Sequence, residues 1–457
     1  MIVPAFDRHP ASYRDPAGFV FSRDGIVFRQ VNTLYKNTFE YLHSNGCYDA
    51  LTAKGFLLPH VTTSEKGVTP DAYVVIRPEQ LDVVTYPYEW SFQMLKDAAL
   101  LTLQTMQTAL EHDMVLKDAT PHNVQWHQGR MVFIDTLSFD RFSERPWIAY
   151  RQFCENFLGP LLLMHYQQQP LHPLHLAWPD GIPLEIVREM LPTRAKFNLH
   201  IYLHIFLHAR YKTGKRDKTG PPAAFTKTKM TNLLRSLTAL VEKCRLKERD
   251  STWSNYYEDA GSRQDYLPQK KTLVGQWLDE FAGISTGADL GANEGEFAEM
   301  MARRGIKTVA ADLDPYCIDR LYKKIRENNS THLQPMVLDL ANASPGNGLN
   351  YKERADFKSR INRDIILALA LVHHIAIGRN IPLEEIAGML KEFGSLLIIE
   401  FVPATDPLVI RMRAGKDHPF ADYSEEHFEQ AFLRYYTLIN KSEIGDSGRI
   451  LYLFKRR

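Results

Sequence analysis

The stretch from residue 287 to 315, "GADLGANEGEFAEMMARRGIKTVAADLDP", constrains the fold more than any other part of the chain. It predicts a strand, a glycine-rich turn, a helix and a second strand that ends in an acid. Gly291 and Gly295 flank Asn293 in the turn, where the missing Cβ lets the backbone approach a ligand. Asp312 follows Gly291 at about the twenty-residue interval expected of an acid that accepts hydrogen bonds from ribose hydroxyls. The stretch therefore predicts the site of a nucleotide-type cofactor.

Two acids in the turn narrow the choice of cofactor. Glu294 and Glu296 surround the start of the predicted helix, where a pyrophosphate would be repelled. A cofactor that carries a sulfonium and an ammonium group, and no phosphate, would tolerate them. The sequence therefore favours a cationic cofactor over a dinucleotide.

The rest of the C-terminal part alternates strands with helices, which indicates a parallel sheet covered by helices. Its ending differs, because "TLINKSEIG" and "GRILYLFKRR" are joined only by Asp446, Ser447 and Gly448. Two strands with so short a join must be antiparallel. The strands are expected near residues 286 to 290, 307 to 311, 334 to 338, 364 to 371 and 395 to 401, followed by this hairpin.

On these motifs, residues 265 to 457 resemble a class I S-adenosylmethionine-dependent methyltransferase. The resemblance implies a Rossmann-like, seven-stranded sheet with a terminal antiparallel hairpin, and S-adenosylmethionine as the cofactor. It also implies roles for individual residues. Asp312 would bind the ribose, and Asp339, after the third strand, would read the adenine amino edge. The family's first motif, whose turn would pack against the methionine part of the cofactor, matches Asp289, Gly291, Asn293 and Gly295.

His373 and His374 are the catalytic candidates, because they directly follow the apolar strand "DIILALALV" that begins at Asp364. Imidazoles titrate near neutral pH and can take a proton from an acceptor, although in-line placement matters most for methyl transfer. The alternative is that one or both histidines hydrogen-bond to loop backbone. Glu400 is a further candidate for the wall of the site. No Asn-Pro-Pro-Tyr type sequence is present, which favours an oxygen or carbon acceptor in a small molecule.

The N-terminal half begins with a small sheet and continues as helices. "FVFSRDGIVFRQV" predicts two strands around an Arg-Asp-Gly turn, and "AYVVIRPEQLDVVTYPYEW" predicts two more. Helices are expected over residues 34 to 54, after Trp90 and, with proline breaks, over 147 to 208.

The segment "LKDATPHNVQWHQGRMVFIDTLSFD" resembles the catalytic loop and metal-binding acid of the protein-kinase-like and aminoglycoside-phosphotransferase superfamily. The resemblance implies an α+β kinase-like domain with Asp118 as the base and with Asn123 and Asp135 as holders of Mg²⁺ and, through it, ATP. The sequence departs from that pattern in three ways. No glycine-rich phosphate loop is present, Lys117 replaces the usual residue before the base, and only an arginine, Arg29 or Arg77, could stand for the ATP-binding lysine. An active phosphotransferase, a binding shell without turnover and a coincidental loop all stay open, and the shell is favoured.

These features divide the chain into a kinase-like domain over residues 1 to 210, a basic linker and connecting helix over 211 to 264, and a methyltransferase domain over 265 to 457. The net charge of +1 gives no general bias toward nucleic acid, although the basic linker leaves RNA open as a partner. The four cysteines form no zinc motif, and His200, His204 and His208 are expected to be hydrogen-bonded imidazoles rather than metal ligands. No membrane span or signal peptide is evident, which predicts the cytoplasm.

The whole chain, through "YRDPAGFVFSRDGIVFRQV", "FIDTLSF" and "LALALVHHI", is similar to bacterial nodulation-type (NoeA-like) methyltransferases. The leading hypothesis is methyl transfer from S-adenosylmethionine to a small-molecule acceptor that the N-terminal domain shapes or presents. The alternatives are a phosphotransferase, a cofactor-regulated binding protein, and an RNA or protein methyltransferase.

Overall fold

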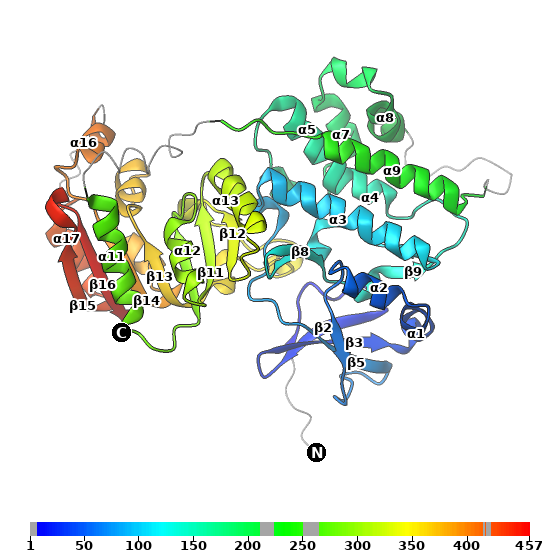
Figure 1. Ribbon diagram of the computed structural model, residues 1–457, viewed down its shortest axis with the longest axis horizontal. Coiled ribbons are helices and arrows are strands. Elements are labelled where there is room, and N and C mark those ends of the chain that lie inside the picture. Colours follow the sequence, from blue (N-terminus) through cyan, green and yellow to red (C-terminus); the bar gives the residue numbers. More distant parts are fainter. Residues whose placement is uncertain (1–6, 211–223, 250–264, 415, 417–421) are drawn as a thin grey trace. The chain divides into compact units, whose positions relative to one another are not determined.

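The computed structural model describes residues 7–210, 224–249, 265–414, 416 and 422–457. The chain forms two compact units, which Figure 1 colours along the sequence. The first contains Met1–Lys247 together with Gly346–Ala355, and the second contains Glu248–Pro345 with Asp356–Arg457. Among the described residues, no helix is both long and apolar enough to cross a membrane.

The second unit is built on one seven-stranded sheet in the order β12-β11-β10-β13-β14-β16-β15. The first five of these strands are parallel, and β16 lies antiparallel between β14 and β15. The predicted sheet and its closing hairpin are therefore confirmed. The strands are β10 (Thr286–Leu290), β11 (Lys307–Asp312), β12 (Leu333–Val337), β13 (Arg363–Ala368), β14 (Gly394–Phe401), β15 (Tyr436–Glu443) and β16 (Ile450–Arg456).

Helices cover both faces of this sheet, and the alternation of side chains along β16 shows how. Leu451 and Leu453 pack in a cluster with residues of α11 and α12, whereas Tyr452 and Phe454 stack beside aromatic residues of α17. Successive residues of a strand point to opposite faces, so the two helix layers lie on opposite sides. The helices of this unit are α11 (Tyr266–Asp279), α12 (Glu296–Arg303), α13 (Pro315–Glu327), α14 (Phe357–Arg360), α15 (Leu383–Leu390), α16 (Pro407–Arg413) and α17 (Glu425–Leu433).

The first unit opens with a five-stranded antiparallel sheet in the order β1-β2-β3-β5-β4. The expected hairpin is present, and Asp24 and Gly25 turn it with φ of 53° and 76°. The strands are β1 (Asp7–Arg8), β2 (Gly18–Arg23), β3 (Ile26–Asn32), β4 (His60–Thr62) and β5 (Ala72–Pro78).

The prediction of a second strand in "AYVVIRPEQLDVVTYPYEW" is wrong, because the segment contains one strand, β5. β5 pairs instead with β4, which comes earlier in the chain. Side chains take the backbone donors that a strand would need: Thr85 N donates to Gln125 Oε1 at 2.9 Å, and Tyr86 N donates to Glu89 Oε2 at 2.9 Å. Pro87 then ends any ladder, because it has no N–H.

The remainder of the first unit is mostly helical around α3, whose N-cap Ser91 accepts a hydrogen bond from Met94 N. Two short hairpins follow α3: β6 (Met114–Leu116) pairs with β9 (Phe139–Arg141), and β7 (Val124–His127) pairs with β8 (Arg130–Phe133). The helices are α1 (Lys36–Ser44), α2 (Cys47–Ala53), α3 (Phe92–Glu111), α4 (Tyr150–Phe153), α5 (Gly159–Gln167), α6 (Leu174–Ala177), α7 (Leu184–Met190), α8 (Leu199–Ile201) and α9 (Lys227–Lys243).

The helix α9 lies in the first unit, although the sequence placed it in a connecting segment. It packs beside α3, and Lys96 Nζ of α3 donates to the carbonyl oxygens of Glu242 and Cys244 at its end. The division between the units accordingly falls after Lys247. Two parts of the expected linker, residues 211–223 and 250–264, lie outside the described residues.

Candidate functional site

The glycine turn lies between β10 and α12, at the carboxyl ends of the parallel strands. Gly291 N and Ala292 N both donate to Ala311 O of β11, at 2.8 and 3.0 Å. Gly291 has φ of 82° and Gly295 has φ of 83°. A Cβ at Gly295 would stand 2.5 Å from Leu321 Cδ1 of α13, so only glycine fits there. The turn is therefore held close to the second strand by its own backbone.

Asp312 fixes the tip of this turn. Its Oδ2 accepts a hydrogen bond from Asn293 N and its Oδ1 accepts one from Asp314 N, each at 2.8 Å. Burial raises the pKa of Asp312 to about 6, against the effect of these two N–H donors. Each oxygen has a second lone pair, so the carboxylate can still accept hydrogen bonds from a ligand.

Asp289, near the end of β10, is a second buried acid at the same place, with 2% of its surface exposed. Burial raises its pKa to about 7; Lys270 opposes the shift and Asp312 adds to it. The pair therefore puts two carboxyl groups of raised pKa beside the glycine turn. A positive charge that entered this place would stabilise both carboxylates.

Asp339 lies after β12, at the same edge of the sheet. Its Oδ1 accepts a hydrogen bond from Ala341 N at 3.0 Å, which caps a short 3₁₀ turn. Its Oδ2 accepts one from Arg379 Nη2 at 2.9 Å. The strand order brings Asp339, Asp312 and Asp289 to neighbouring strand ends, as the sequence predicted for a cofactor-binding edge.

Glu294 and Glu296 were expected to repel a pyrophosphate, but each pairs with a cation of a neighbouring helix. Glu294 pairs with Arg320 of α13 at 2.6 Å, and Glu296 pairs with Lys271 of α11 at 2.5 Å. Because both charges are neutralised by cations, they say little about the cofactor. Asp289 and Asp312 are instead the acids that would repel a pyrophosphate at this turn.

The two candidate catalytic histidines follow β13, which ends at Ala368 rather than at residue 371. His373 is fully buried, and among the described residues neither of its ring nitrogens has a hydrogen-bond partner. Its ring lies 3.9 Å from that of His374, centroid to centroid. Burial lowers the pKa of His373 well below its usual value and that of His374 to about 4. Both rings are therefore neutral at physiological pH. Asp364, at the other end of the strand, instead accepts hydrogen bonds from Ser285 and Thr286.

Glu400 of β14 is the centre of a buried charge network. Its carboxylate lies 2.6 Å from Lys270 Nζ and 3.3 Å from Arg449 Nη1, and Tyr266 Oη donates to it at 2.5 Å. Arg449 also pairs with Asp406 at 2.9 Å. Burial alone would raise the pKa of Glu400, but Lys270 and Arg449 hold it below its usual value. The sequence named Glu400 and missed its partners.

The first unit brings its three candidate residues together. Asp135 caps the 3₁₀ turn that follows β8, and its Oδ2 accepts a hydrogen bond from Ser138 Oγ at 2.6 Å. Asn123 Nδ2 donates to the same Ser138 Oγ at 3.3 Å. Burial raises the pKa of Asp118, and the charge of Asp135 adds to this effect while hydrogen bonds from Asn123 and others oppose it. Of the two candidate arginines, Arg29 lies in this cluster, paired with Asp135.

The chain between β12 and β13 contributes ten residues, 346–355, to the first unit. Two of them are buried there. Glu353 accepts a hydrogen bond from Arg14 Nη2 at 3.1 Å, and Arg354 Nε lies 3.2 Å from His122 Nε2. Ala355 N donates to Tyr86 Oη at 2.9 Å. His122 belongs to the loop that carries Asp118 and Asn123, so this inserted segment supports the candidate site of the first unit.

The three spaced histidines of the first unit contact other side chains. His200 Nδ1 and His204 Nε2 lie 2.8 and 2.7 Å from Ser236 Oγ, and His204 Nδ1 lies 2.6 Å from Tyr150 Oη. The ring of His208 stacks on that of Tyr150. In the described part of the chain, no three His, Cys, Asp or Glu side chains are placed to hold a metal ion together.

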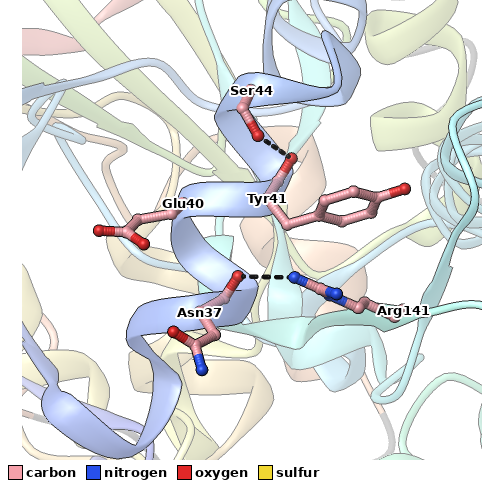
Figure 2. Close-up of a pocket in the computed structure, with 5 residues that line it drawn as sticks. All are labelled: Asn37, Glu40, Tyr41, Ser44 and Arg141. Atoms are coloured by element: carbon pink, nitrogen blue, oxygen red, sulfur yellow. Dashed lines mark hydrogen bonds between the residues drawn. The ribbon is translucent and has the colours of Figure 1, made fainter.

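Figure 2 shows an open polar pocket elsewhere on the first unit, between α1 and the end of β9. Arg141 Nη2 donates to Asn37 O at 3.3 Å, and the guanidinium lies 4.3 Å from the ring centroid of Tyr41. Glu40 and Ser44 complete the lining. It contains none of the residues predicted for either site.

Comparison with known proteins places the chain in a family. No protein-family model matches it. Among solved structures, similar chains are the magnesium protoporphyrin IX methyltransferase ChlM from Synechocystis PCC 6803 (15% identity, 45% of this chain and 96% of that one, TM-score 0.32) and the N-methyltransferase NodS from Bradyrhizobium japonicum WM9 (13%, 42% and 98%, 0.32). The bifunctional kinase-methyltransferase WbdD is similar at 16% identity over 48% of this chain and 45% of that one, with a TM-score of 0.30.

Nodulation protein NoeA of Rhizobium meliloti (strain 1021) is 32% identical over 471 residues, which cover 99% of this chain and 97% of that protein. The chain belongs to the NoeA family.

Proposed function

We propose that the second unit transfers the methyl group of S-adenosylmethionine to a small-molecule acceptor, and that the first unit shapes or presents that acceptor. One observation carries the proposal: Asp289 and Asp312, two buried carboxyl groups with raised pKa values, lie at the glycine turn in which Gly291 and Gly295 have φ of 82° and 83°. A pyrophosphate would meet two acids there. A sulfonium and an ammonium group would be attracted by the two carboxylates.

The other parts of the cofactor have matching residues at neighbouring strand ends. Asp312 keeps lone pairs for ribose hydroxyls, because within the described part of the chain each of its oxygens accepts one backbone N–H. Asp339 is suited to the adenine amino group. Its Oδ2 is held by Arg379, whose side chain is about half exposed and can move when the adenine arrives.

On the acceptor side, His373 and His374 follow the strand that adjoins β10. Their lowered pKa values make them weak bases but leave neutral ring nitrogens that can exchange hydrogen bonds with an acceptor hydroxyl. Glu400 has a different role. Since Lys270, Arg449 and Tyr266 already occupy its carboxylate, it supports the wall of the site and takes no proton. Placement of the acceptor, rather than strong base catalysis, is then the main contribution to the rate.

The inserted segment 346–355 supports a role for the first unit. It holds His122, in the loop of Asp118 and Asn123, and it continues along the chain into β13 and then His373. Binding of an acceptor near that loop would therefore act on the chain that leads to the methyl-transfer site.

Calorimetric titration of the full chain with S-adenosylmethionine and with S-adenosylhomocysteine tests the proposal. We expect both to bind and Asp312→Ala to weaken both. Asp364→Asn is the matched control, because Asp364 lies at the opposite edge of the same sheet, where its carboxylate accepts hydrogen bonds from Ser285 and Thr286. Binding of neither cofactor to the folded wild type would end the proposal, as would an equal loss in the control variant.

The acceptor can be sought by incubating cell extract with the enzyme and cofactor that carries a labelled methyl group. Label recovered in a small molecule, and dependent on His374, supports the proposal. Label recovered only in RNA or protein would instead favour a macromolecular acceptor.

A further inference from the structure

The candidate kinase-like site of the first unit contains a cation of its own. Arg29 stands in the middle of β3, and its Nη1 lies 2.5 Å from Asp135 Oδ1. Both side chains are largely shielded from solvent, with 13% and 15% of their surfaces exposed. A charge pair at this distance and burial is screened little by water.

Both carboxylate oxygens of Asp135 are already in use. Oδ1 also accepts a hydrogen bond from Leu137 N at 3.0 Å, and Oδ2 accepts the short bond from Ser138 Oγ. Ser138 in turn accepts a hydrogen bond from the amide of Asn123. The side chains of Asn123, Ser138, Asp135 and Arg29 therefore form one continuous network.

This network of side chains does not fit the Mg²⁺ that the kinase resemblance implies. Mg²⁺ binds in a nearly ideal octahedron at about 2.0–2.1 Å and takes carboxylate oxygens as direct ligands. At Asp135 it would have to displace the guanidinium or stand beside it, and two positive groups at such a distance repel strongly. Arginine stays charged at every physiological pH, so no change in pH removes the obstacle.

We propose that Arg29 takes the place of the divalent cation, so that the site of Asp118, Asn123 and Asp135 works without a metal. Asp118 is then a binding group. Its Oδ1 is buried and has no hydrogen-bond partner among the described residues, so it is ready to accept one from a ligand. The ligand class that suits the site is a molecule that donates hydrogen bonds, such as one bearing hydroxyl groups. A metal nucleotide does not suit it, because the guanidinium of Arg29 takes the place at Asp135 that an ion bridging the phosphates would need.

Mn²⁺ is the probe that tests this, since its binding to the full chain can be counted by electron paramagnetic resonance with and without a non-hydrolysable ATP analogue. We expect wild type and Asp135→Asn to bind the same amount of Mn²⁺. Arg29→Met keeps a long side chain without the charge and should gain one site per chain, at least tenfold tighter than any in the wild type. The double variant Arg29→Met/Asp135→Asn should lose that site.

Arg29→Lys is the matched control, because it keeps the positive charge and should gain no site. Mn²⁺ binding to the wild type that Asp135→Asn abolishes would overturn the proposal. A folded Arg29→Met variant that gains no site would overturn it as well. Circular dichroism reports folding, and if Arg29→Met does not fold, the comparison of wild type with Asp135→Asn decides alone.

Discussion

The affinity for S-adenosylmethionine should fall when the pH is lowered from 7.5 to 6, because the proposed cofactor site requires Asp289 and Asp312 as carboxylates. Burial raises their pKa values to about 7 and about 6. Below these values each group is mostly protonated in the free protein, and its proton must leave before the sulfonium and ammonium groups gain a negative partner. The favourable interaction is therefore nearly complete above about pH 8 and is lost as the pH falls through about 7 and then about 6.

The size of the effect follows from the two pKa values. For a group that is ionised in the complex, the fraction of free protein in the competent form sets the apparent affinity. Between pH 7.5 and pH 6 that fraction falls about eightfold for Asp289 and about twofold for Asp312. Together they predict a loss of about 16-fold, or about 1.6 kcal/mol. The cofactor's own amino group stays mostly protonated over this range, so it contributes little.

Isothermal titration calorimetry in buffers of different ionisation enthalpy would measure both the affinity and the protons released on binding. We expect about one proton to be released at pH 6 to 6.5, and fewer at pH 7.5. In Asp289→Asn the affinity should be weaker and should keep only the smaller dependence due to Asp312. A wild-type affinity that is flat between pH 6 and 7.5, or a slope that Asp289→Asn leaves unchanged, would show that the cofactor does not depend on an ionised Asp289.

Three further outcomes follow from the same site. Because the folded-state pKa of Asp289 is raised, ionisation of Asp289 lowers the free energy of unfolding as the pH rises from about 4 to 7. At pH 8, without cofactor, urea unfolding of Asp289→Asn should therefore give a free energy of unfolding up to about 4 kcal/mol higher than that of the wild type. Lys270→Met leaves Glu400 short of a buried partner and should destabilise the protein by about 3–5 kcal/mol in urea unfolding, with partial recovery when Glu400→Gln is added. Gly295→Ala should cost about 2–3 kcal/mol and weaken cofactor binding. Gly283→Ala, where φ is 90° and an added Cβ would have no described residue beyond its chain neighbours within 4 Å, should cost only about 1 kcal/mol and leave binding unchanged.

The sequence predicted the second unit well because its signals are local. The alternation of Leu451 and Leu453 with Tyr452 and Phe454 is written in the chain, and a join of three residues leaves an antiparallel pair as the one available arrangement. The acids at the strand ends were found for the same reason. A strand's end and the residue that follows it can be read from the sequence without knowing what packs around them.

The buried charge network could not be predicted from neighbouring residues, because its members come from four separate parts of the chain. One signal was present. Lys270 lies four residues after Tyr266 and four before Val274, on the stripe of α11 that faces the core. A lysine in such a stripe requires a buried acid as its partner. Which acid it meets depends on the packing of α11 against β14, and the sequence does not contain that information in any local pattern.

The sequence-based boundary between the halves failed at residues 346–355 for a related reason. A boundary drawn from composition assumes that each domain is a continuous piece of chain, whereas the first unit takes ten residues from between β12 and β13. Glu353 and Arg354 are buried there, with 8% and 7% of their surfaces exposed. Their contacts with Arg14 and His122 are lost if the first unit is produced as residues 1–247 alone.

That fragment should therefore unfold at a lower temperature than the first unit does within the full chain, and a peptide of residues 344–357 should raise its melting temperature. In the peptide, Glu353→Gln removes the charge that Arg14 binds and should weaken the effect. A fragment as stable as the unit in the full chain, and indifferent to the peptide, would show that the inserted segment only follows the surface of the first unit. A fragment that depends on the peptide would mean that the first unit is complete only with chain from between two strands of the methyltransferase-like sheet, so that neither unit can be assayed faithfully after separation at Lys247.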